Sequence, residues 1–232
     1  MRILIQCLAV LCMLAPALAR AEQVPVVVEL FTSQGCSSCP PADALLAELG
    51  ERDDVIALAL HVDYWDYIGW KDVFAQSKFT KRQKGYAQAA GWRTIYTPQA
   101  VINGSEDVVG SKPMKLADAI ARHKAQPQRV KLDIRRDGGG LSIRAEGLGA
   151  GVPAAEVHLV RYEPAAPVRI LRGENAGHTL TYTHIVQDWS VIDRWNGRGV
   201  YQKRVAVSGT APIVVLVQEP RQGSILAAAR LR

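Results

Sequence analysis

Apolar and polar positions follow two different periods in the first half of the chain. The runs over 26–31 and 55–62 are short and almost entirely apolar, which is typical of strands buried on both faces of a sheet. Between them, apolar side chains from Ser37 to Leu49 recur at helical spacing, and Gly50 follows as a stop signal. The pattern therefore predicts a strand, a helix and a second buried strand in that order.

The same alternation continues to about residue 124. Apolar spacing predicts helices over 74–90 and 113–124, with short strands over 100–102 and 107–109. Asn103-Gly104 lies between the two short strands and predicts a hairpin turn. Strands that alternate with helices indicate an α/β layer, which we assign to a domain over residues 22–126.

After Gln126-Pro127 the helical spacing is lost and the apolar runs become short. Clusters of turn residues, such as Asp137–Gly140 and Gly173–Gly177, separate these runs. We therefore predict that residues 127–232 form a smaller, all-β, sandwich-like domain. The predicted strands cover residues 130–135, 141–145, 157–162, 178–186, 200–207 and 213–217.

The N-terminus has the pattern of a secretory signal. Arg2 precedes an apolar run from Ile3 to Leu18, and small residues then follow in an A-x-A arrangement. A membrane anchor is the alternative, but the run is shorter than the roughly 20 apolar residues that span a bilayer. We predict a signal peptide over residues 1–21, a periplasmic or secreted location, and no membrane association after its removal.

Composition narrows the choice of partner. The chain carries 28 Lys and Arg against 22 Asp and Glu, a net charge of +6, without a dense basic stretch interleaved with aromatic residues. Nucleic acid is therefore not an expected partner. Removal of residues 1–21 would take away Cys7 and Cys12, so that Cys36 and Cys39 are the cysteines that remain.

Cys36 and Cys39 lie where the first strand gives way to the first helix. Unpaired backbone N–H groups and the positive end of the helix dipole favour a thiolate at the first cysteine of such a pair. We expect Cys36 to be accessible to solvent and to attack a partner disulfide, and Cys39, more buried, to resolve the mixed disulfide. This chemistry needs no cofactor.

Two other uses of the pair are open. Structural zinc uses the same spacing, but it normally takes four ligands, and the sequence has no second cysteine pair or His-x-x-x-His motif. A purely local disulfide is the other alternative, although a loop closed by a two-residue spacer gains little stabilisation from chain entropy. We therefore predict a redox pair and no bound metal.

The segment after the second predicted helix adds a resemblance. Thr97-Pro98, the following strand, the Asn-Gly turn and Asp107 to Gly110 resemble the corresponding part of the thioredoxin fold in order and spacing. The resemblance implies that Pro98 is cis and packs beside the two cysteines. It also implies that the backbone of Thr97 pairs with the substrate chain. A trans proline in an ordinary turn is the alternative.

A closer resemblance covers nearly the whole chain after the predicted signal. The runs Val28 to Asp43, His61 to Trp65 and Gly173 to Asn175 resemble a family of secreted bacterial proteins, classed as a domain of unknown function with a thioredoxin-like fold. The resemblance implies the fold but no substrate. The chain departs from thioredoxin at Gly35, where an aromatic residue usually precedes the first cysteine, and at the two prolines that follow Cys39.

The thioredoxin resemblance also implies roles for three further residues. Glu29 lies close to the position of a buried carboxylate that accepts a proton from the resolving cysteine, with an offset of one residue. The alternative is a glutamate that reaches solvent at the strand end. His61 and Trp65 are expected to shape a substrate groove. His61 could instead join the two cysteines in a copper site, or simply be a hydrogen-bonded strand residue.

These observations predict an exported, thioredoxin-like protein, and we expect it to be a thiol-disulfide oxidoreductase that uses Cys36 and Cys39. Its partner would be a protein that carries a thiol or a disulfide. The alternative, from another functional class, is a binding module without catalysis, or a protein that handles copper. The direction of electron flow depends on the reduction potential of the pair, which the sequence does not specify.

Overall fold

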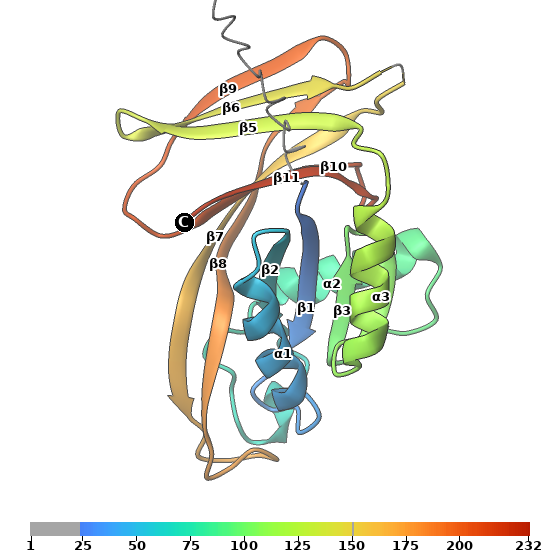
Figure 1. Cartoon of the computed structure of the whole chain (residues 1–232). Coiled ribbons are helices and arrows are strands. Elements are labelled where there is room, and N and C mark those ends of the chain that lie inside the picture. Colours follow the sequence, from blue (N-terminus) through green and yellow to red (C-terminus); the bar gives the residue numbers. More distant parts are fainter. Residues whose placement is uncertain (1–23, 150) are drawn as a thin grey trace, which may run out of the picture.

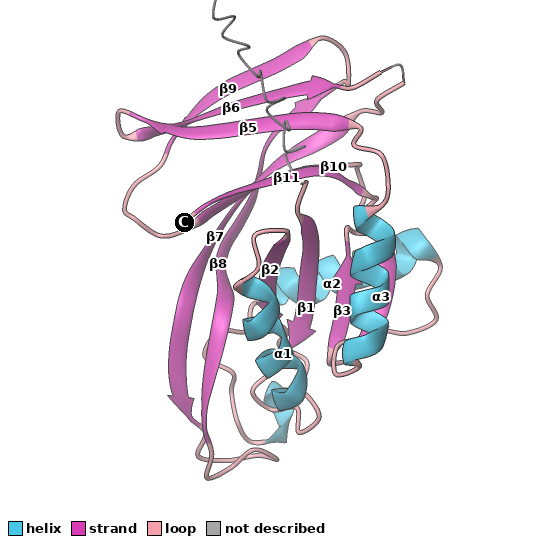
Figure 2. Ribbon diagram, in the orientation of Figure 1, coloured by secondary structure: helices cyan, strands magenta, loops and turns pink. Residues whose placement is uncertain are grey.

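A computed structural model describes residues 24–149 and 151–232, so the predicted signal peptide lies outside the described residues. The chain has a mixed α/β fold with an eight-stranded mixed sheet and a three-stranded antiparallel sheet (Figure 1). Figure 2 shows that the helices gather around one end of the large sheet, whereas the opposite end of the molecule is built from strands.

The helices and strands have the following bounds. They are β1 (Val26–Thr32), α1 (Pro40–Gly50), β2 (Val55–His61), the short 3-10 helix η1 (Asp66–Ile68), α2 (Ser77–Ala90), β3 (Gln99–Ile102), β4 (Glu106–Val109), α3 (Pro113–Lys124), β5 (Val130–Asp137), β6 (Gly140–Gly147), β7 (Ala155–Arg169), β8 (Thr179–Trp195), β9 (Val200–Ala206), β10 (Ile213–Gln218) and β11 (Ile225–Leu231).

The large sheet has the strand order β11-β10-β7-β8-β2-β1-β3-β4. Within it, β1 pairs in parallel with β2 and antiparallel with β3. Every residue of β1 and β2 is buried, which confirms the prediction drawn from their apolar runs.

Alternate residues of β1 face different helices. Val28 and Leu30 belong to a hydrophobic cluster with α1 and α3. Val27 and Phe31 belong to a cluster on the opposite face, which includes Phe79 of α2. Because successive side chains of a strand point to opposite faces, each residue of β1 is assigned to one of these two environments.

The second half of the chain consists of strands, as predicted, but these strands are divided between the two sheets. β7, β8, β10 and β11 extend the large sheet, and the link to the first half is the pairing of Ala59 in β2 with Ile185 in β8. β5, β6 and β9 form the small sheet, which packs on part of the large sheet around a shared apolar cluster. The sequence analysis did not predict β11, whose alanine-rich run has weak strand propensity.

The β7–β8 hairpin is long enough to reach the first helix. β7 has 15 residues and β8 has 17, but β7 pairs with β10 only over residues 156–161. The remaining part of the hairpin runs beside α1, and its turn lies near the N-terminal end of that helix (Figure 1). The hairpin therefore brings residues around 175 next to the loop that carries Cys36.

Candidate functional site

Cys36 and Cys39 form a disulfide in the loop between β1 and α1. Their sulfur atoms are 2.15 Å apart and their Cα atoms 5.4 Å apart. The loop is tightly folded, because the Cys36 N–H donates to the Ser33 carbonyl at 3.1 Å and the Cys39 N–H donates to the Cys36 carbonyl at 3.2 Å. The predicted pairing of these two cysteines is confirmed as a disulfide.

Both cysteines are buried, which corrects one prediction. Cys39 is 0% exposed, as expected of the more buried partner, but Cys36 is only 1% exposed. Ser37 and Ser38 between them are exposed, so the disulfide lies directly beneath the surface. The turn of the β7–β8 hairpin is hydrogen-bonded to the backbone of this loop.

Glu174 and Asn175, in the turn between β7 and β8, make hydrogen bonds to the loop that carries Cys36. The Asn175 side-chain amide donates to the Gln34 carbonyl at 2.9 Å and to the Cys36 carbonyl at 3.0 Å. The Glu174 carboxylate accepts the Ser37 N–H at 3.1 Å. These partners are 137 to 141 residues apart in the chain, so no local pattern around the cysteines could have indicated the contact.

The N-terminus of α1 has fewer free N–H groups to stabilise a Cys36 thiolate than the sequence analysis expected. Helix α1 begins at Pro40 rather than at Ser37, with Cys39 as its N-cap. Pro40 and Pro41 have no N–H, and the N–H groups of Cys39 and Ala42 already donate to the Cys36 and Cys39 carbonyls. The four N–H groups that a helix normally leaves free are therefore all accounted for. The nearest hydroxyl partner of the Cys36 sulfur is Ser38 Oγ, at 3.4 Å.

Thr97 and Pro98 directly precede β3, the neighbour of β1 in the large sheet. The Thr97–Pro98 peptide bond is cis, as the resemblance implied. A methyl group added at Gly110 would be 3.2 Å from Cβ of Ala42 and 3.4 Å from Cβ of Pro98. Pro98 therefore packs near Ala42, which lies in the first turn of α1, three residues after Cys39.

Trp65 connects this segment to the cysteine loop. Its indole N–H donates to the Thr97 hydroxyl at 2.7 Å. On the other side, a methyl group at Gly35 would lie 3.2 Å from Cβ of Trp65. Trp65 thus contacts both the loop that carries Cys36 and the segment that carries Thr97 and Pro98. Because Gly35 has no side chain, Trp65 can pack closely against the loop.

Glu29 does not have either predicted role. Its side chain is 0% exposed, and it shares the face of β1 that packs against α2, whereas the cysteines precede α1 on the opposite face. Its carboxylate accepts hydrogen bonds from Arg82 Nε at 2.6 Å, Arg82 Nη2 at 2.9 Å and the Tyr86 hydroxyl at 2.6 Å. Glu29 is therefore a buried partner of α2, and it is neither a base for Cys39 nor exposed to solvent.

His61 is likewise too buried to line a substrate groove. It is 0% exposed, and its Nδ1 lies 2.7 Å from an Asp72 carboxylate oxygen. The rings of Phe74 and Tyr182 pack edge-on against it, at centroid distances of 5.2 and 5.1 Å. The prediction that His61 contacts substrate is therefore wrong, because its strand ends inside the molecule, covered by β8 and the segment after η1.

Asp43 is the ionisable residue near the disulfide that the sequence analysis missed. It follows Cys39 by four residues, so both lie on one face of α1, and the Asp43 N–H donates to the Cys39 carbonyl at 3.0 Å. Its Oδ2 is buried and accepts no hydrogen bond from the described part of the chain. The i, i+4 spacing from Cys39 was visible in the sequence and could have identified it.

The surroundings of Asp43 favour its neutral form. Burial raises the pKa of its carboxyl from 3.8 to about 7. His61 and the hydroxyl of Thr32 oppose this shift in pKa, and Asp72 adds to it. Buried polar atoms of Thr32 and His61 also lack a hydrogen-bond partner among the described residues. Asp43 is half-buried, with its buried Oδ2 one helical turn from Cys39.

Comparison with known proteins assigns the chain to a family. Residues 27–218 match the model of a family described as "Protein of unknown function (DUF1223)". The chain belongs to the DUF1223 family. The match spans α1, the disulfide loop and the hairpin turn that is hydrogen-bonded to it, so these features lie within the part of the chain that defines membership.

Two solved structures resemble this DUF1223 protein. A protein from Agrobacterium tumefaciens, determined by X-ray crystallography, is 32% identical, covers 90% of this chain and 95% of its own, and gives a TM-score of 0.78. HBP35 of Porphyromonas gingivalis is 16% identical and covers 90% of this chain and 75% of its own, with a TM-score of 0.64, which indicates a shared fold alone. No protein with curated annotation matches the chain.

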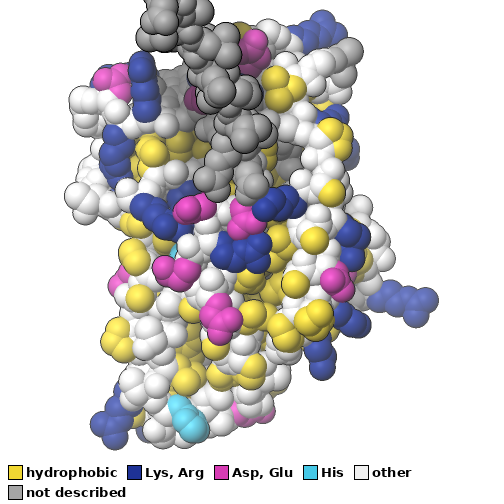
Figure 3. Space-filling model, viewed as in Figure 1, with side chains coloured by type: hydrophobic (Ala, Val, Ile, Leu, Met, Phe, Trp, Pro, Cys, Tyr) yellow, Lys and Arg dark blue, Asp and Glu magenta, His cyan; other side chains and the backbone are white. Residues whose placement is uncertain are grey.

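We also searched the described residues for metal-binding groups, membrane-spanning helices and charged patches. Residues 24–149 and 151–232 contain no group of three His, Cys, Asp or Glu side chains placed to hold a metal ion. Within the same ranges, no helix is both long and apolar enough to cross a bilayer. On the face shown in Figure 3, acidic and basic side chains are mixed in the centre.

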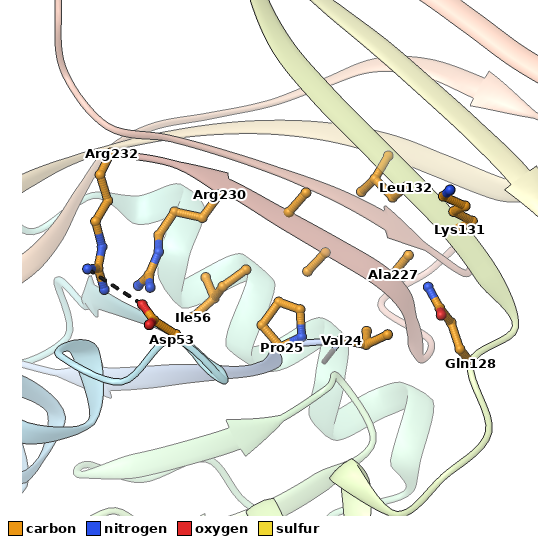
Figure 4. Close-up of a pocket in the computed structure, with 12 residues that line it drawn as sticks. Val24, Pro25, Asp53, Ile56, Gln128, Lys131, Leu132, Ala227, Arg230 and Arg232 are labelled. Atoms are coloured by element: carbon orange, nitrogen blue, oxygen red, sulfur yellow. Dashed lines mark ion pairs between the residues drawn. The ribbon is translucent and has the colours of Figure 1, made fainter. Parts of the chain in front are cut away.

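A cavity of about 590 Å³ lies at the opposite end of β1 from the disulfide (Figure 4). Arg230 and Arg232 point into it beside Asp53, over an apolar floor that includes Ile56. Their guanidinium groups already donate to carbonyls at the C-terminal end of α1, with Arg232 Nη2 at 3.0 Å from the Gly50 oxygen. The charges of this cavity thus stabilise a helix end, and we assign it no ligand.

Asp43 gives the DUF1223 protein an expected pH dependence. The unfolded chain ionises this carboxyl near its ordinary pKa of 3.8, whereas the folded protein retains the proton up to about pH 7. The stabilisation due to neutral Asp43 is therefore complete below pH 4 and is lost as the pH rises to about 7. Asp43→Asn removes this titration. Its stability relative to the wild type should rise by about 2 to 4 kcal/mol from pH 4 to pH 8, measured by urea denaturation.

A matched control for this experiment is Asp118→Asn, which changes an exposed carboxylate on α3. We expect it to follow the wild-type dependence on pH. If Asp43→Asn also follows the wild-type curve between pH 4 and pH 8, the carboxyl of Asp43 does not retain its proton in the folded state.

Proposed function

We propose that this DUF1223 protein is an exported, thioredoxin-like thiol-disulfide oxidoreductase that uses the Cys36–Cys39 disulfide. The observation that carries the proposal is the position of this disulfide directly before α1, together with the cis Thr97–Pro98 bond, whose proline lies near the first turn of that helix. A disulfide at the start of a helix with a cis-proline nearby is the arrangement that the thioredoxin resemblance implies.

The reaction is a sequence of two thiol-disulfide exchanges. A partner thiolate attacks Cys36 Sγ and forms a mixed disulfide, while the Cys36–Cys39 bond breaks and its electron pair leaves on the Cys39 sulfur. A second partner thiolate then attacks the partner sulfur of the mixed disulfide and releases Cys36 as a thiolate. The partner dithiol is oxidised by two electrons, and the protein disulfide is reduced by two electrons. The reverse sequence reduces a partner disulfide.

Asp43 is suited to handle the proton of Cys39. A neutral Asp43 carboxyl, which burial maintains up to about pH 7 because its pKa is raised, can donate a proton to the Cys39 thiolate as that sulfur leaves. The carboxylate that remains can accept the proton again when Cys39 attacks in the reverse direction. Asp43 thus replaces Glu29 in the proposed mechanism, because Asp43 shares the face of α1 with Cys39 and Glu29 faces α2.

A structural disulfide is the second candidate function, and burial favours it. Cys36 and Cys39 are only 1% and 0% exposed, so neither sulfur is accessible to a partner in this conformation. In that case the protein would be a binding module or scaffold, and the disulfide would only stabilise the loop before α1. The reduction potential of the pair separates the two candidates.

Equilibration of the mature protein with glutathione redox buffers measures this potential. An oxidoreductase should equilibrate reversibly, with a potential in the range of about −270 to −120 mV that known members of this chemistry span. The fraction of free thiols at each buffer ratio is read by alkylation and mass spectrometry. A potential below about −300 mV, typical of structural disulfides, would contradict the proposed function.

The proposed location also has a direct test. The signal-like pattern over residues 1–21 and the presence of a disulfide both support export, since disulfides persist in oxidising compartments. Expression of the full chain, followed by cell fractionation and N-terminal sequencing, should find a mature protein that begins near residue 22. Retention of the uncleaved chain in the cytoplasm would contradict this part of the proposal.

A further inference from the structure

Thr32 and His61 end two neighbouring strands beneath helix α1. They are paired with each other in the parallel register of β1 with β2. Two residues earlier on each strand, Leu30 and Ala59 belong to the hydrophobic cluster that includes the buried residues of α1. Because side chains two positions apart in a strand point to one face, Thr32 and His61 also point toward α1, the helix that carries Asp43.

Asp72 holds the His61 ring from its other side. The His61 Nδ1 lies 2.7 Å from Asp72 Oδ2, and the two side chains are 0% and 1% exposed. The same carboxylate accepts the Gln34 N–H at 2.8 Å and the Phe74 N–H at 2.8 Å. Three donors thus satisfy this carboxylate, as a buried negative charge requires. Since Nδ1 donates to Asp72, Nε2 is the ring nitrogen that remains for other groups.

Three buried polar atoms at this end of the strands have no hydrogen-bond partner among the described residues. They are His61 Nε2, Thr32 Oγ1 and Asp43 Oδ2. Unpaired buried polar atoms are costly, so three of them in one region need an explanation in the chemistry of the site. Burial raises the pKa of Asp43 to about 7, while His61 and then the Thr32 hydroxyl act to lower it and Asp72 acts to raise it. The three groups therefore act on one another.

Tyr182 of β8 faces the same region. Its ring packs edge-on against His61, with centroids 5.1 Å apart. Burial raises the pKa of its phenol, and Asp43 and Asp72 add to this shift, so Tyr182 stays neutral. On α1 itself, Cys39 is held in the disulfide until reduction. The charges that face Asp43 from the segments packed against it are therefore those of His61 and Asp72.

We propose that His61, held by Asp72, is a positioning residue for the resolving step, in which Asp43 exchanges a proton with Cys39. When Asp43 gives its proton to the Cys39 sulfur, the carboxylate that remains faces the imidazole and the Thr32 hydroxyl. A proton on His61 Nε2 and the O–H dipole of Thr32 stabilise this anion, more strongly inside the protein than in water. The transferred proton moves only between Asp43 and Cys39. This role deepens the proposed function and rests on it for the identity of the reaction.

The first measurement follows the ionisation of Asp43 by carboxyl ¹³C NMR in the oxidised mature chain. The resonance is assigned by its absence from Asp43→Asn. His61→Gln removes the ring and its charge but keeps an N–H donor for Asp72. The midpoint, about pH 7 in the wild type, should rise by about one pH unit or more, because an opposite charge no longer stabilises the carboxylate. Thr32→Val removes the hydroxyl and keeps the shape of the side chain, and it should give a smaller rise.

His178→Gln is the matched control, since this histidine is exposed in the turn between β7 and β8. It should leave the midpoint of Asp43 unchanged. A purely structural role of His61 predicts a loss of stability without any shift of that midpoint. Circular dichroism and thermal unfolding check the fold of each variant, and Thr32→Val decides the question if His61→Gln does not fold.

The second measurement follows reduced protein mixed with oxidised glutathione, by acid quench and mass spectrometry at successive times. Appearance of the mixed disulfide on Cys36 reports the first step, and its loss reports the attack by Cys39, whose proton the Asp43 carboxylate accepts. A midpoint that moves by about one unit from pH 7 lowers the ionised fraction at pH 7 about fivefold. His61→Gln should therefore slow the second step about fivefold at pH 7 and little at pH 9. The first step should keep its wild-type rate.

Unchanged midpoints in His61→Gln and Thr32→Val would overturn the inference. A second step whose pH dependence does not follow the midpoint would also overturn it, while the wild type would still exchange disulfides. Failure of the proposed function gives a different result: the wild-type potential would lie below about −300 mV and glutathione would not be released by Cys39, whatever the midpoint of Asp43. That result would remove the reaction and, with it, the role assigned to His61.

Discussion

Cys36→Ser is expected to abolish disulfide exchange, leaving less than about 1% of the wild-type rate, because a serine hydroxyl can neither form nor break a disulfide. In the proposed mechanism Cys39 only resolves the mixed disulfide, so it does not replace Cys36. Both cysteines are buried, and Cys39 is the N-cap of α1. The rate is measured as transfer of oxidising equivalents to a reduced cysteine-containing peptide.

Cys39→Ser should behave differently from Cys36→Ser. The remaining Cys36 thiol can still attack a partner disulfide, but no second sulfur is present to break the mixed disulfide that forms. A covalent complex should therefore accumulate and be visible by non-reducing electrophoresis and mass spectrometry. Ser38→Ala is the control within the same loop, because Ser38 lies 3.4 Å from the Cys36 sulfur but carries no electrons in the exchange. Full activity of Cys36→Ser, or trapping by Cys36→Ser rather than Cys39→Ser, would contradict the assigned roles.

Arg82→Ala is expected to cause a large loss of stability at a site away from the disulfide. Arg82 is buried between β1 and α2, where it donates to both carboxylate oxygens of Glu29 and lies 3.8 Å from the ring centroid of Trp189. Its removal leaves the Glu29 charge inside the protein with only Tyr86 as a hydrogen-bond partner among these contacts. Loss of one member of a buried ion pair costs about 3 to 5 kcal/mol, which urea denaturation can measure.

Two further variants show whether the ion pair is the cause. Lys84→Ala changes an exposed residue two positions along α2 and should alter the unfolding free energy by about 0.5 kcal/mol or less. The double variant Glu29→Leu with Arg82→Met removes both charges, so it should recover much of the loss caused by Arg82→Ala. A loss below about 1 kcal/mol for Arg82→Ala would contradict the assignment of Glu29 and Arg82 as a buried structural pair.

The network around Glu29 also explains how the large sheet is joined across its halves. Gln218 of β10 accepts a hydrogen bond from Arg82 at 2.9 Å and donates to the Tyr86 hydroxyl at 2.9 Å. Side chains from β1, α2 and β10 thus satisfy one another inside the protein, where an unpaired polar group would be costly. A glutamate in an otherwise apolar strand therefore has a structural cause here.

Some errors of the sequence analysis were avoidable. Pro40 and Pro41 indicate by themselves that α1 begins at Pro40, since proline is favoured at the first helical position and has no N–H to donate. The same two residues already showed that this helix has few free N–H groups for a thiolate. The spacing of Asp43 from Cys39 was also local, and helix geometry alone places the two residues on one face.

Other features depended on contacts between distant parts of the chain. The sequence distinguishes a buried Glu29 from an exposed one only if its partner is known, and Arg82 is 53 residues away. The Cys36 carbonyl accepts a hydrogen bond from Asn175, 139 residues away, and this contact needs a hairpin that extends beyond β10. The attachment of the β-rich half to the large sheet depends on the pairing of Ala59 with Ile185, which are far apart in the sequence.

The sequence by itself determined the order of helices and strands in the first half, the β character of the second half, and the pair of cysteines before α1. These properties follow from residue spacing, turn chemistry and neighbours within a few positions, so they are present in the chain before it folds. Only the tertiary structure decided which atoms surround the disulfide, which carboxyl is neutral and which is ion-paired. Burial and pKa depend on every segment packed against a group, and packing brings together residues that the chain keeps far apart.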